Sequence, residues 1–236
     1  MQNSLSSAFF PLPRRAFAVL TGTALLFAAR PALPAEILVK DGQKVAFMGD
    51  SITAGGWGSP GGYVRLVVAG LEANGVKVTP IPAGISGHKS DQMLARLKKD
   101  ALDKQPSWMT LSCGVNDVWH GEKDPTRGTM PDKFESGLEE VIGKCTAAGA
   151  RVILCTPTVI GEKSDGSNSL DAKLDQYADI SRGVAKKLNL SLCDLRKAFI
   201  DHLKANLLGE LMNDGGLSNT SITGDESISK DLVGAS

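Results

Sequence analysis

The stretch FMGDSITAGG, residues 47–56, decides the fold because it joins a buried strand to the start of a helix. The run KVAFMG (44–49) is short and mostly apolar, which is typical of a strand buried on both faces of a parallel sheet. Ser51 follows at a predicted helix N-terminus, where free N–H groups favour negative charge. Serine and aspartate are also preferred helix caps. The stretch alone therefore leaves two interpretations of Ser51 open, a catalytic nucleophile and a helix cap.

Short apolar runs and longer amphipathic segments continue to alternate along the chain. This alternation predicts an α/β fold with a parallel sheet and helices on both faces. Ligands of such sheets lie beyond the carboxyl ends of the strands, and Ser51, the 84–88 loop and the 114–120 loop follow three of those ends. We therefore expect a site where these three segments meet. The expected strands are 44–49, 76–83, 107–114, 151–157 and 190–195, and the expected helices are 61–74, 90–104, 131–148 and 168–188.

Length and composition indicate one globular domain. The chain has 236 residues, of which 42% are hydrophobic and 22% charged, so it can form a single sizeable core. Its formal net charge is zero, and no run of Lys and Arg is longer than two residues. Nucleic acids and anionic membranes are therefore not expected partners.

Residues 1–35 are predicted to be an export signal peptide. Arg14 and Arg15 precede the 14-residue apolar stretch AFAVLTGTALLFAA (16–29), and RPALPA then leads to Glu36. Export signals typically have a basic start, an apolar stretch of this length and small residues before the cleavage site. A membrane span is usually longer. An uncleaved anchor is the alternative. We expect an exported protein, periplasmic or extracellular, with no stable membrane insertion once the signal is removed.

The cysteine pattern does not indicate a metal site. The four cysteines, Cys113, Cys145, Cys155 and Cys193, form no CxxC motif and have no nearby histidine at ligand spacing. Three of them lie in apolar runs, which favours small buried core residues. An exported protein could instead pair them as disulfides. The sequence leaves these alternatives open.

Several common site motifs do not fit their context. GWGSPG (56–61) has the GxGxxG form, but it begins beyond the expected strand, contains Pro60 and lacks the later acidic residue of a dinucleotide site. No GxxxxGK[ST] sequence occurs, so a P-loop is not expected. GISGH (84–88) is not the GxSxG of an α/β-hydrolase nucleophile elbow.

Three other motifs occur in order, each one strand further along the chain. They are GDSIT (49–53), AGISGHKS (83–90) and CGVNDVWHG (113–121). Together they resemble the motifs of the SGNH, or GDSL, hydrolase family, which comprises serine esterases and lipases with a flavodoxin-like fold. The stretches GGYVRLV (61–67) and SDQMLARL (90–97) also resemble the sequences of that family. The resemblance covers about residues 44–205.

The resemblance implies roles for three residues. Ser51 would be the nucleophile, and the Ser51 N–H, the Gly87 N–H and the Asn116 side-chain amide would form the oxyanion hole. Each donor of this kind stabilises the tetrahedral intermediate of ester hydrolysis by about 2.7–4 kcal/mol. The family cleaves carboxylic esters and thioesters, commonly of acyl lipids or acetylated carbohydrates, without a metal or cofactor. The implied partner is a small-molecule or glycan ester.

The general base of the family comes from a DxxH motif near the C-terminus, and no histidine follows His202 here. His88 and His120 belong to the loops of the expected site, and either is an alternative base. The literal DVWH (117–120) lies inside the third motif rather than after the fifth strand. His202 lies in a helical run and is expected at the surface.

The segment 209–236 is rich in Ser, Thr, Gly, Asp and Asn, so we expect a poorly ordered tail after a domain at 36–208. Within it, LMNDGGLSN (211–219) aligns Asp214 with the Asp of the family motif and Leu217 with its His. A chance match, a shifted reading frame and a truncation near residue 207 are the alternatives.

Three functional hypotheses follow from the sequence. The first is an SGNH esterase whose activity is impaired by the missing histidine. The second is a non-catalytic relative that binds acyl or glycan ligands. The third is a flavodoxin-like binding domain unrelated to hydrolases.

Overall fold

The computed structural model describes residues 37–213 except 162, 164 and 166. Five parallel strands form one sheet in the order β2-β1-β3-β4-β5. This is the strand order of flavodoxin-like folds, so the predicted fold class is confirmed. The strands are β1 (Lys44–Gly49), β2 (Thr79–Gly84), β3 (Trp108–Ser112), β4 (Arg151–Cys155) and β5 (Ser191–Cys193).

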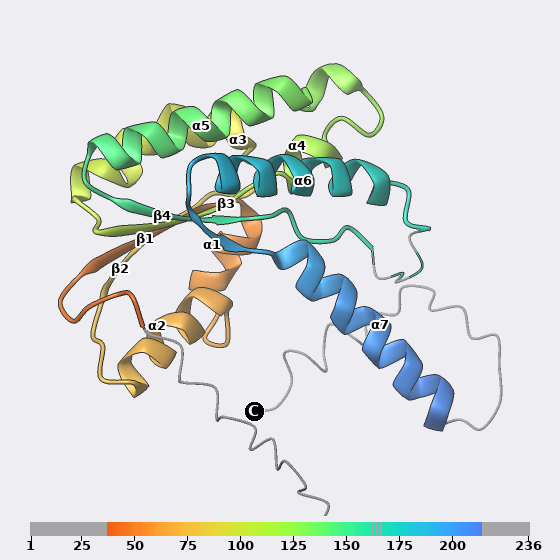
Figure 1. Cartoon of the computed structure of the whole chain (residues 1–236), viewed down its shortest axis with the longest axis horizontal. Helices are drawn as coiled ribbons and strands as arrows, with labels where there is room; N and C mark the ends of the chain where they lie inside the picture. The colour runs from red at the N-terminus through yellow and green to blue at the C-terminus, as the bar shows by residue number, and fades with distance from the viewer. Residues whose placement is uncertain (1–36, 162, 164, 166, 214–236) are drawn as a thin grey trace, which may run out of the picture. The chain divides into compact units, whose positions relative to one another are not determined.

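Helices cover both faces of the sheet (Figure 1). Helices α3, α5 and α6 lie over one face, and α1 and α2 lie over the other. The helices are α1 (Ser51–Gly58), α2 (Tyr63–Ala73), α3 (Ser90–Asp100), α4 (Val115–Trp119), α5 (Pro131–Ala147), α6 (Asp171–Lys187) and α7 (Leu195–Asn213), with short 3-10 turns η1 (Leu102–Lys104) and η2 (Pro125–Arg127).

The side-chain alternation of the central strand builds the two cores. Phe47 packs with Val64 and Trp108 under α2, whereas the next residue, Met48, packs with Leu111 on the opposite face. Successive side chains of a strand point to opposite faces, so a continuous apolar run such as β1 supplies both cores.

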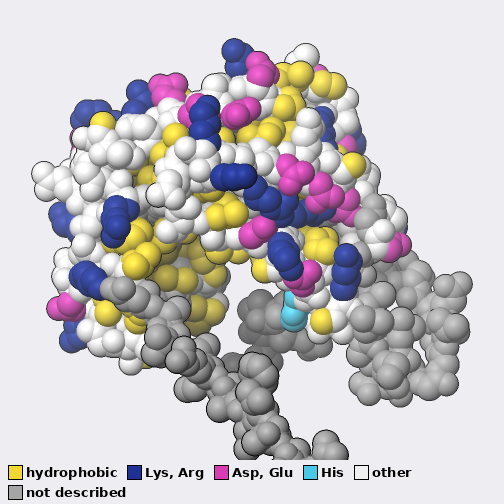
Figure 2. All heavy atoms as spheres, in the orientation of Figure 1, with side chains coloured by type: hydrophobic (Ala, Val, Ile, Leu, Met, Phe, Trp, Pro, Cys, Tyr) yellow, Lys and Arg dark blue, Asp and Glu magenta, His cyan; other side chains and the backbone are white. Residues whose placement is uncertain are grey.

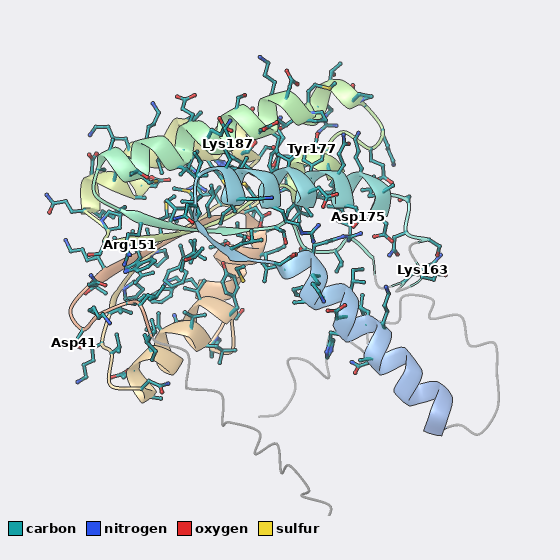
Figure 3. All side chains as sticks on the ribbon, in the orientation of Figure 1. Asp41, Arg151, Lys163, Asp175, Tyr177 and Lys187 are labelled. Atoms are coloured by element: carbon teal, nitrogen blue, oxygen red, sulfur yellow. The ribbon has the colours of Figure 1, made fainter. Side chains whose placement is uncertain are left out.

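An ion pair joins two of the covering helices on the outer surface. Lys187 at the end of α6 pairs with Glu139 of α5 at 2.7 Å (Figure 3).

The register places the carboxyl ends of three strands together. Gly49, the last residue of β1, is opposite Gly84, the last residue of β2. On the other side of β1, Met48 is opposite Leu111, one residue before the end of β3. The strand order reverses at this place, which is where open α/β sheets bind ligands.

Three helices account for the main differences from the predicted elements. All five strands and helices α2, α3, α5 and α6 lie within a few residues of the expected ranges, whereas α1, α4 and the 19-residue α7 were not among the expected helices. Helix α7 ends at Asn213 and therefore includes the first five residues of the expected tail, 209–213. The rest of that tail and the expected signal peptide 1–35 lie outside the described residues.

The surface carries charges of both signs. In the view of Figure 2, Lys and Arg side chains alternate with Asp and Glu, and no single basic patch is visible. Within the part of the chain that the structure describes, no helix has the length and apolar character needed to cross a membrane.

Candidate active site

Ser51 is the first residue of α1, directly after strand β1, and its side chain is exposed. The helix cap is the preceding residue, since the Asp50 carboxylate accepts the Ile52 N–H at 2.9 Å. The N–H of Ser51 belongs to the first turn, where N–H groups have no acceptor within the helix. The helix cap is therefore Asp50, and the Ser51 hydroxyl takes no part in capping the helix.

Two glycines allow the start of α1 to approach the sheet closely. A Cβ atom at Gly84 would lie 2.3 Å from the Ala54 nitrogen, and a Cβ at Gly49 would lie 2.0 Å from Thr53 Oγ1. Any larger residue at either position would push α1 away from the ends of β1 and β2. The glycine that begins the GDSIT motif is therefore required by packing, and the packing holds Ser51 at the sheet edge.

The second and third motifs are joined to the first by hydrogen bonds. The Ile85 N–H donates to the Gly49 carbonyl at 3.1 Å, which ties the loop after β2 to the end of β1. The Asn116 amide nitrogen donates to the His88 carbonyl at 3.1 Å, which ties α4 to the same loop. Gly87, between these two links, has a φ of +76°, a conformation that favours glycine. The three predicted site residues therefore lie on segments that contact one another.

Asp117 fixes the position of the helix that carries Asn116. Its buried carboxylate accepts both the N–H of Ser90, at 3.2 Å, and the Ser90 hydroxyl, at 2.5 Å. These bonds attach α4 to the N-terminus of α3. Asn116 is itself only 4% exposed, so its side chain has little freedom to turn away.

Arg96 of α3 joins the ends of β1 and β2 to the loop that follows β2. Its guanidinium donates to the Gly49 carbonyl at 2.9 Å and to the Ala83 carbonyl at 2.8 Å. It also pairs with Asp100 at 3.0 Å, and its Nε donates to His88 Nδ1 at 3.1 Å. One side chain thus holds the ends of β1 and β2 and the loop that carries Gly87.

The hydrogen bond from Arg96 fixes the tautomer of the neutral His88 ring. Because Nδ1 accepts a hydrogen bond, the proton of the neutral ring is on Nε2. Burial, and then the positive charge of Arg96, lower the pKa of His88, so the neutral form is favoured. A ring with Nδ1 occupied and Nε2 protonated has no free basic nitrogen with which to accept the proton of a serine.

Neither of the other two histidines forms a hydrogen bond with Ser51. His120 follows the last residue of α4 and contacts the ring of Trp119, with centroids 5.7 Å apart. His202 is exposed on α7 and bonds to Asn206 at 2.9 Å, as expected for a surface residue. Among the described residues, the Ser51 hydroxyl has no hydrogen-bond partner. Asp214 and Leu217 lie outside the described residues, so their alignment with the DxxH motif stays a prediction.

Sequence reasoning did not identify three residues that support the site. Asp50 was considered only as a preferred residue type for a helix cap, Asp117 only as the start of the literal DVWH, and Arg96 lay inside a motif stretch without being singled out. The sequence signal that could have identified these residues is a charged side chain inside an apolar or motif segment, because a buried charge requires partners. In the described part of the chain, no cluster of three or more His, Cys, Asp or Glu side chains is arranged to hold a metal ion.

Known proteins resemble this chain over most of its length. The acetylxylan esterase of Geobacillus stearothermophilus is 29% identical over 183 residues, which are 70% of this chain and 82% of that protein. Its crystal structure superposes with a TM-score of 0.65 and covers 71% of this chain and 83% of its own. Solved variants of that enzyme include two catalytic mutants, in which a serine and a histidine are replaced by alanine.

A second solved structure gives a higher sequence identity. The acetyl xylan esterase AlAXEase is 40% identical to this chain, with a TM-score of 0.65, and the match covers 70% of this chain and 84% of that one. The model of the GDSL-like lipase/acylhydrolase family matches residues 47–216, which include all three motifs of the site. The chain belongs to the GDSL-like lipase/acylhydrolase family.

Proposed function

We propose that this chain is an exported esterase of acetylated carbohydrates in which Ser51 is the nucleophile. The observation that carries the proposal is the exposed Ser51 at the start of α1, beside a separate cap at Asp50. The similarity to two acetylxylan esterases supports acetyl groups on a glycan as the substrate class. The Ser51 N–H, the Gly87 N–H and the Asn116 amide are the proposed oxyanion hole.

The proposed chemistry is acyl transfer through serine. The Ser51 hydroxyl attacks the acetyl carbonyl, and the three donors stabilise the oxyanion that develops on the carbonyl oxygen. Collapse of the intermediate releases the sugar hydroxyl and leaves an acetyl-enzyme, which water then hydrolyses to acetate. Both halves of this reaction require a base that takes a proton from the attacking hydroxyl or water.

We propose further that the activity of this exact chain is impaired. Among the described residues no imidazole forms a hydrogen bond with Ser51, and Nδ1 of His88 is occupied by Arg96. The position that we align with the family histidine is Leu217. Loss of one triad member costs on the order of 10⁴–10⁶ in rate, which leaves about 10³–10⁴ over the uncatalysed reaction. Binding of the glycan ester does not depend on the base.

The second candidate function is therefore binding without turnover. It is favoured by the same hydrogen bond that occupies His88 Nδ1, since this bond removes one of the alternative bases. In this interpretation the site around Ser51 recognises acyl or acetylated glycan ligands and releases them unchanged.

Labelling with a fluorophosphonate probe separates the two candidates, because the probe reacts with an activated serine. For the impaired esterase we expect slow labelling that Ser51→Ala abolishes, together with weak release of p-nitrophenol from p-nitrophenyl acetate. A binding protein would give no labelling but would bind acetylated xylooligosaccharides in calorimetry. Turnover at ordinary esterase rates would contradict the proposed impairment, and labelling that survives in Ser51→Ala would contradict the assignment of the nucleophile.

A further inference from the structure

Cys155 and Cys193 occupy paired positions on neighbouring strands. Cys155 is the last residue of β4, Cys193 is the last residue of β5, and the two are directly opposite in the parallel register. Neighbouring strands lie about 4.7–4.9 Å apart, which is inside the range of about 4.4–6.8 Å that a disulfide requires between Cα atoms. Directly opposite residues also project their side chains from the same face of the sheet, so the two thiols point the same way.

The two thiols interact and differ in reactivity. The hydrogen bond between them, followed by burial, raises the pKa of the Cys155 thiol, and the same bond lowers the pKa of Cys193 to about 7. Cys193 is exposed, whereas Cys155 is buried. An accessible thiol with a lowered pKa is the one that attacks an external disulfide, and a buried neighbour can then resolve the mixed disulfide.

The other two cysteines are not placed to compete. Cys113 follows Ser112, which is the residue opposite Cys155, so Cys113 lies on the other face of the sheet. Burial raises the pKa of its thiol well above the ordinary value. Cys145 is buried in α5, where its Sγ donates to Met109 Sδ at 3.8 Å. The geometry therefore selects one pair out of the four cysteines.

We propose that Cys155 and Cys193 are a redox-active pair that closes into a cross-strand disulfide between β4 and β5. The oxidant is a small-molecule disulfide such as oxidised glutathione. The Cys193 thiolate attacks one of its sulfurs and releases one glutathione thiolate. Cys155 then loses its proton and attacks the Cys193 sulfur, which breaks the mixed disulfide and releases the second glutathione. Two protein thiols are oxidised, and one glutathione disulfide is reduced to two thiols.

The bond would fix the weakest strand of the sheet. β5 has three residues, pairs only with β4 and has three exposed positions. The residues after it begin α7, where the Arg196 N–H donates to Thr156 Oγ1 at 2.9 Å and its guanidinium pairs with Asp171 at 2.8 Å. Arg196 also pairs with Asp175 of α6, beside the first turn of α7 (Figure 3). A disulfide at 155–193 therefore ties this whole junction to the sheet, as an oxidising compartment would allow.

The test is a redox titration of the full chain in glutathione buffers, followed by tryptic mass spectrometry without reduction. We expect a linked pair of the peptides VILCTPTVIGEK (152–163) and LNLSLCDLR (188–196). The number of titratable thiols in denaturant should fall from four to two. Because the loop that the bond closes is long, the Tm of the oxidised protein should rise by roughly 5–10 °C over the reduced one.

Two variants serve as matched controls. Cys193→Ser should keep three titratable thiols and show no oxidative rise in Tm, whereas Cys145→Ala should still form the link and keep one thiol. Four free thiols in fully oxidising buffer would overturn the proposal. Glutathione retained on Cys193 beside a free Cys155, or a link that involves Cys113 or Cys145, would overturn it equally. None of these outcomes depends on esterase activity.

Discussion

At the scale of single residues, Asp50 has two opposing effects on stability. Its carboxylate caps α1 through the Ile52 N–H, which stabilises the start of the helix. The same group is buried, and its burial, together with the charge of Asp117, raises its pKa above the ordinary value of 3.8. Ionisation at neutral pH is therefore less favourable in the folded chain than in the unfolded chain.

The first prediction concerns Asp50→Asn. The Asn oxygen can still accept the Ile52 N–H, and no charge is buried, so the variant should be more stable than the natural chain at pH 7. A raised folded pKa means that stability is fully present below pH 3.8 and is lost as the pH rises through the folded pKa. The stability gain of the variant should therefore appear as the pH increases, in urea denaturation at several pH values.

Asp50→Ala is the control that isolates the cap. It removes both the charge and the acceptor, so it should be less stable than Asp50→Asn by about 1 kcal/mol at every pH. Equal stability of the two variants would show that the cap contributes nothing. A gain in the Asn variant that is constant with pH would contradict a cost of ionisation.

At the scale of elements, the contact of α1 with the strand ends determines where Ser51 lies. Gly84 ends β2 directly against α1, where a Cβ would lie 2.3 Å from the Ala54 nitrogen and 2.7 Å from the Thr53 carbonyl carbon, both of them backbone atoms. A methyl group cannot be accommodated there by rotation of a flexible side chain. Helix α1 would have to move away from the sheet.

Gly84→Ala should therefore destabilise the fold by roughly 1–3 kcal/mol and also lower the labelling of Ser51 by a fluorophosphonate. Gly70→Ala, on the exposed side of α2, is the matched control, because a Cβ there meets nothing within 4 Å. It should stabilise the chain by about 0.5–1 kcal/mol, since glycine is costly inside a helix. Chemical denaturation measures both effects, and equal changes in the two variants would refute the close approach of α1 and β2.

The elements also show which signals in the sequence are reliable. β1 and α5 are predicted almost to the residue, because a continuous apolar run and a long amphipathic repeat reflect burial directly. Helix α1, SITAGGWG, has three glycines and no amphipathic repeat, so only its cap signals it. Gly56 is present for packing, since a Cβ there would lie 2.5 Å from the Tyr63 ring. Tertiary contacts override helix propensity in this segment.

At the scale of the whole molecule, the motif order predicts the candidate site better than any single motif does. Ser51, Gly87 and Asn116 follow strand ends that the fold brings together, which the alternation of elements predicts. The hydrogen bonds of Arg96 to two strand ends join residues up to 47 positions apart, so no local pattern reveals them. The proposed alignment of Asp214 and Leu217 with the family DxxH motif concerns the chain beyond residue 213, outside the described residues.

The last prediction tests whether that segment once supplied the base. If Leu217 stands at the position of the family histidine, Leu217→His should raise kcat/KM for p-nitrophenyl acetate by at least about 100-fold, because a restored base returns part of the 10⁴–10⁶ that its loss costs. The gained activity should fall with pH below about 6.5, where an unperturbed imidazole becomes protonated. Leu217→Gln is the matched control, since it adds polarity without a titratable base, and it should give no gain. Leu217→His combined with Ser51→Ala should lose the gain entirely. If Leu217→His is no more active than Leu217→Gln, the alignment of Asp214 and Leu217 with the DxxH motif is wrong, while the family assignment stands on the other three motifs.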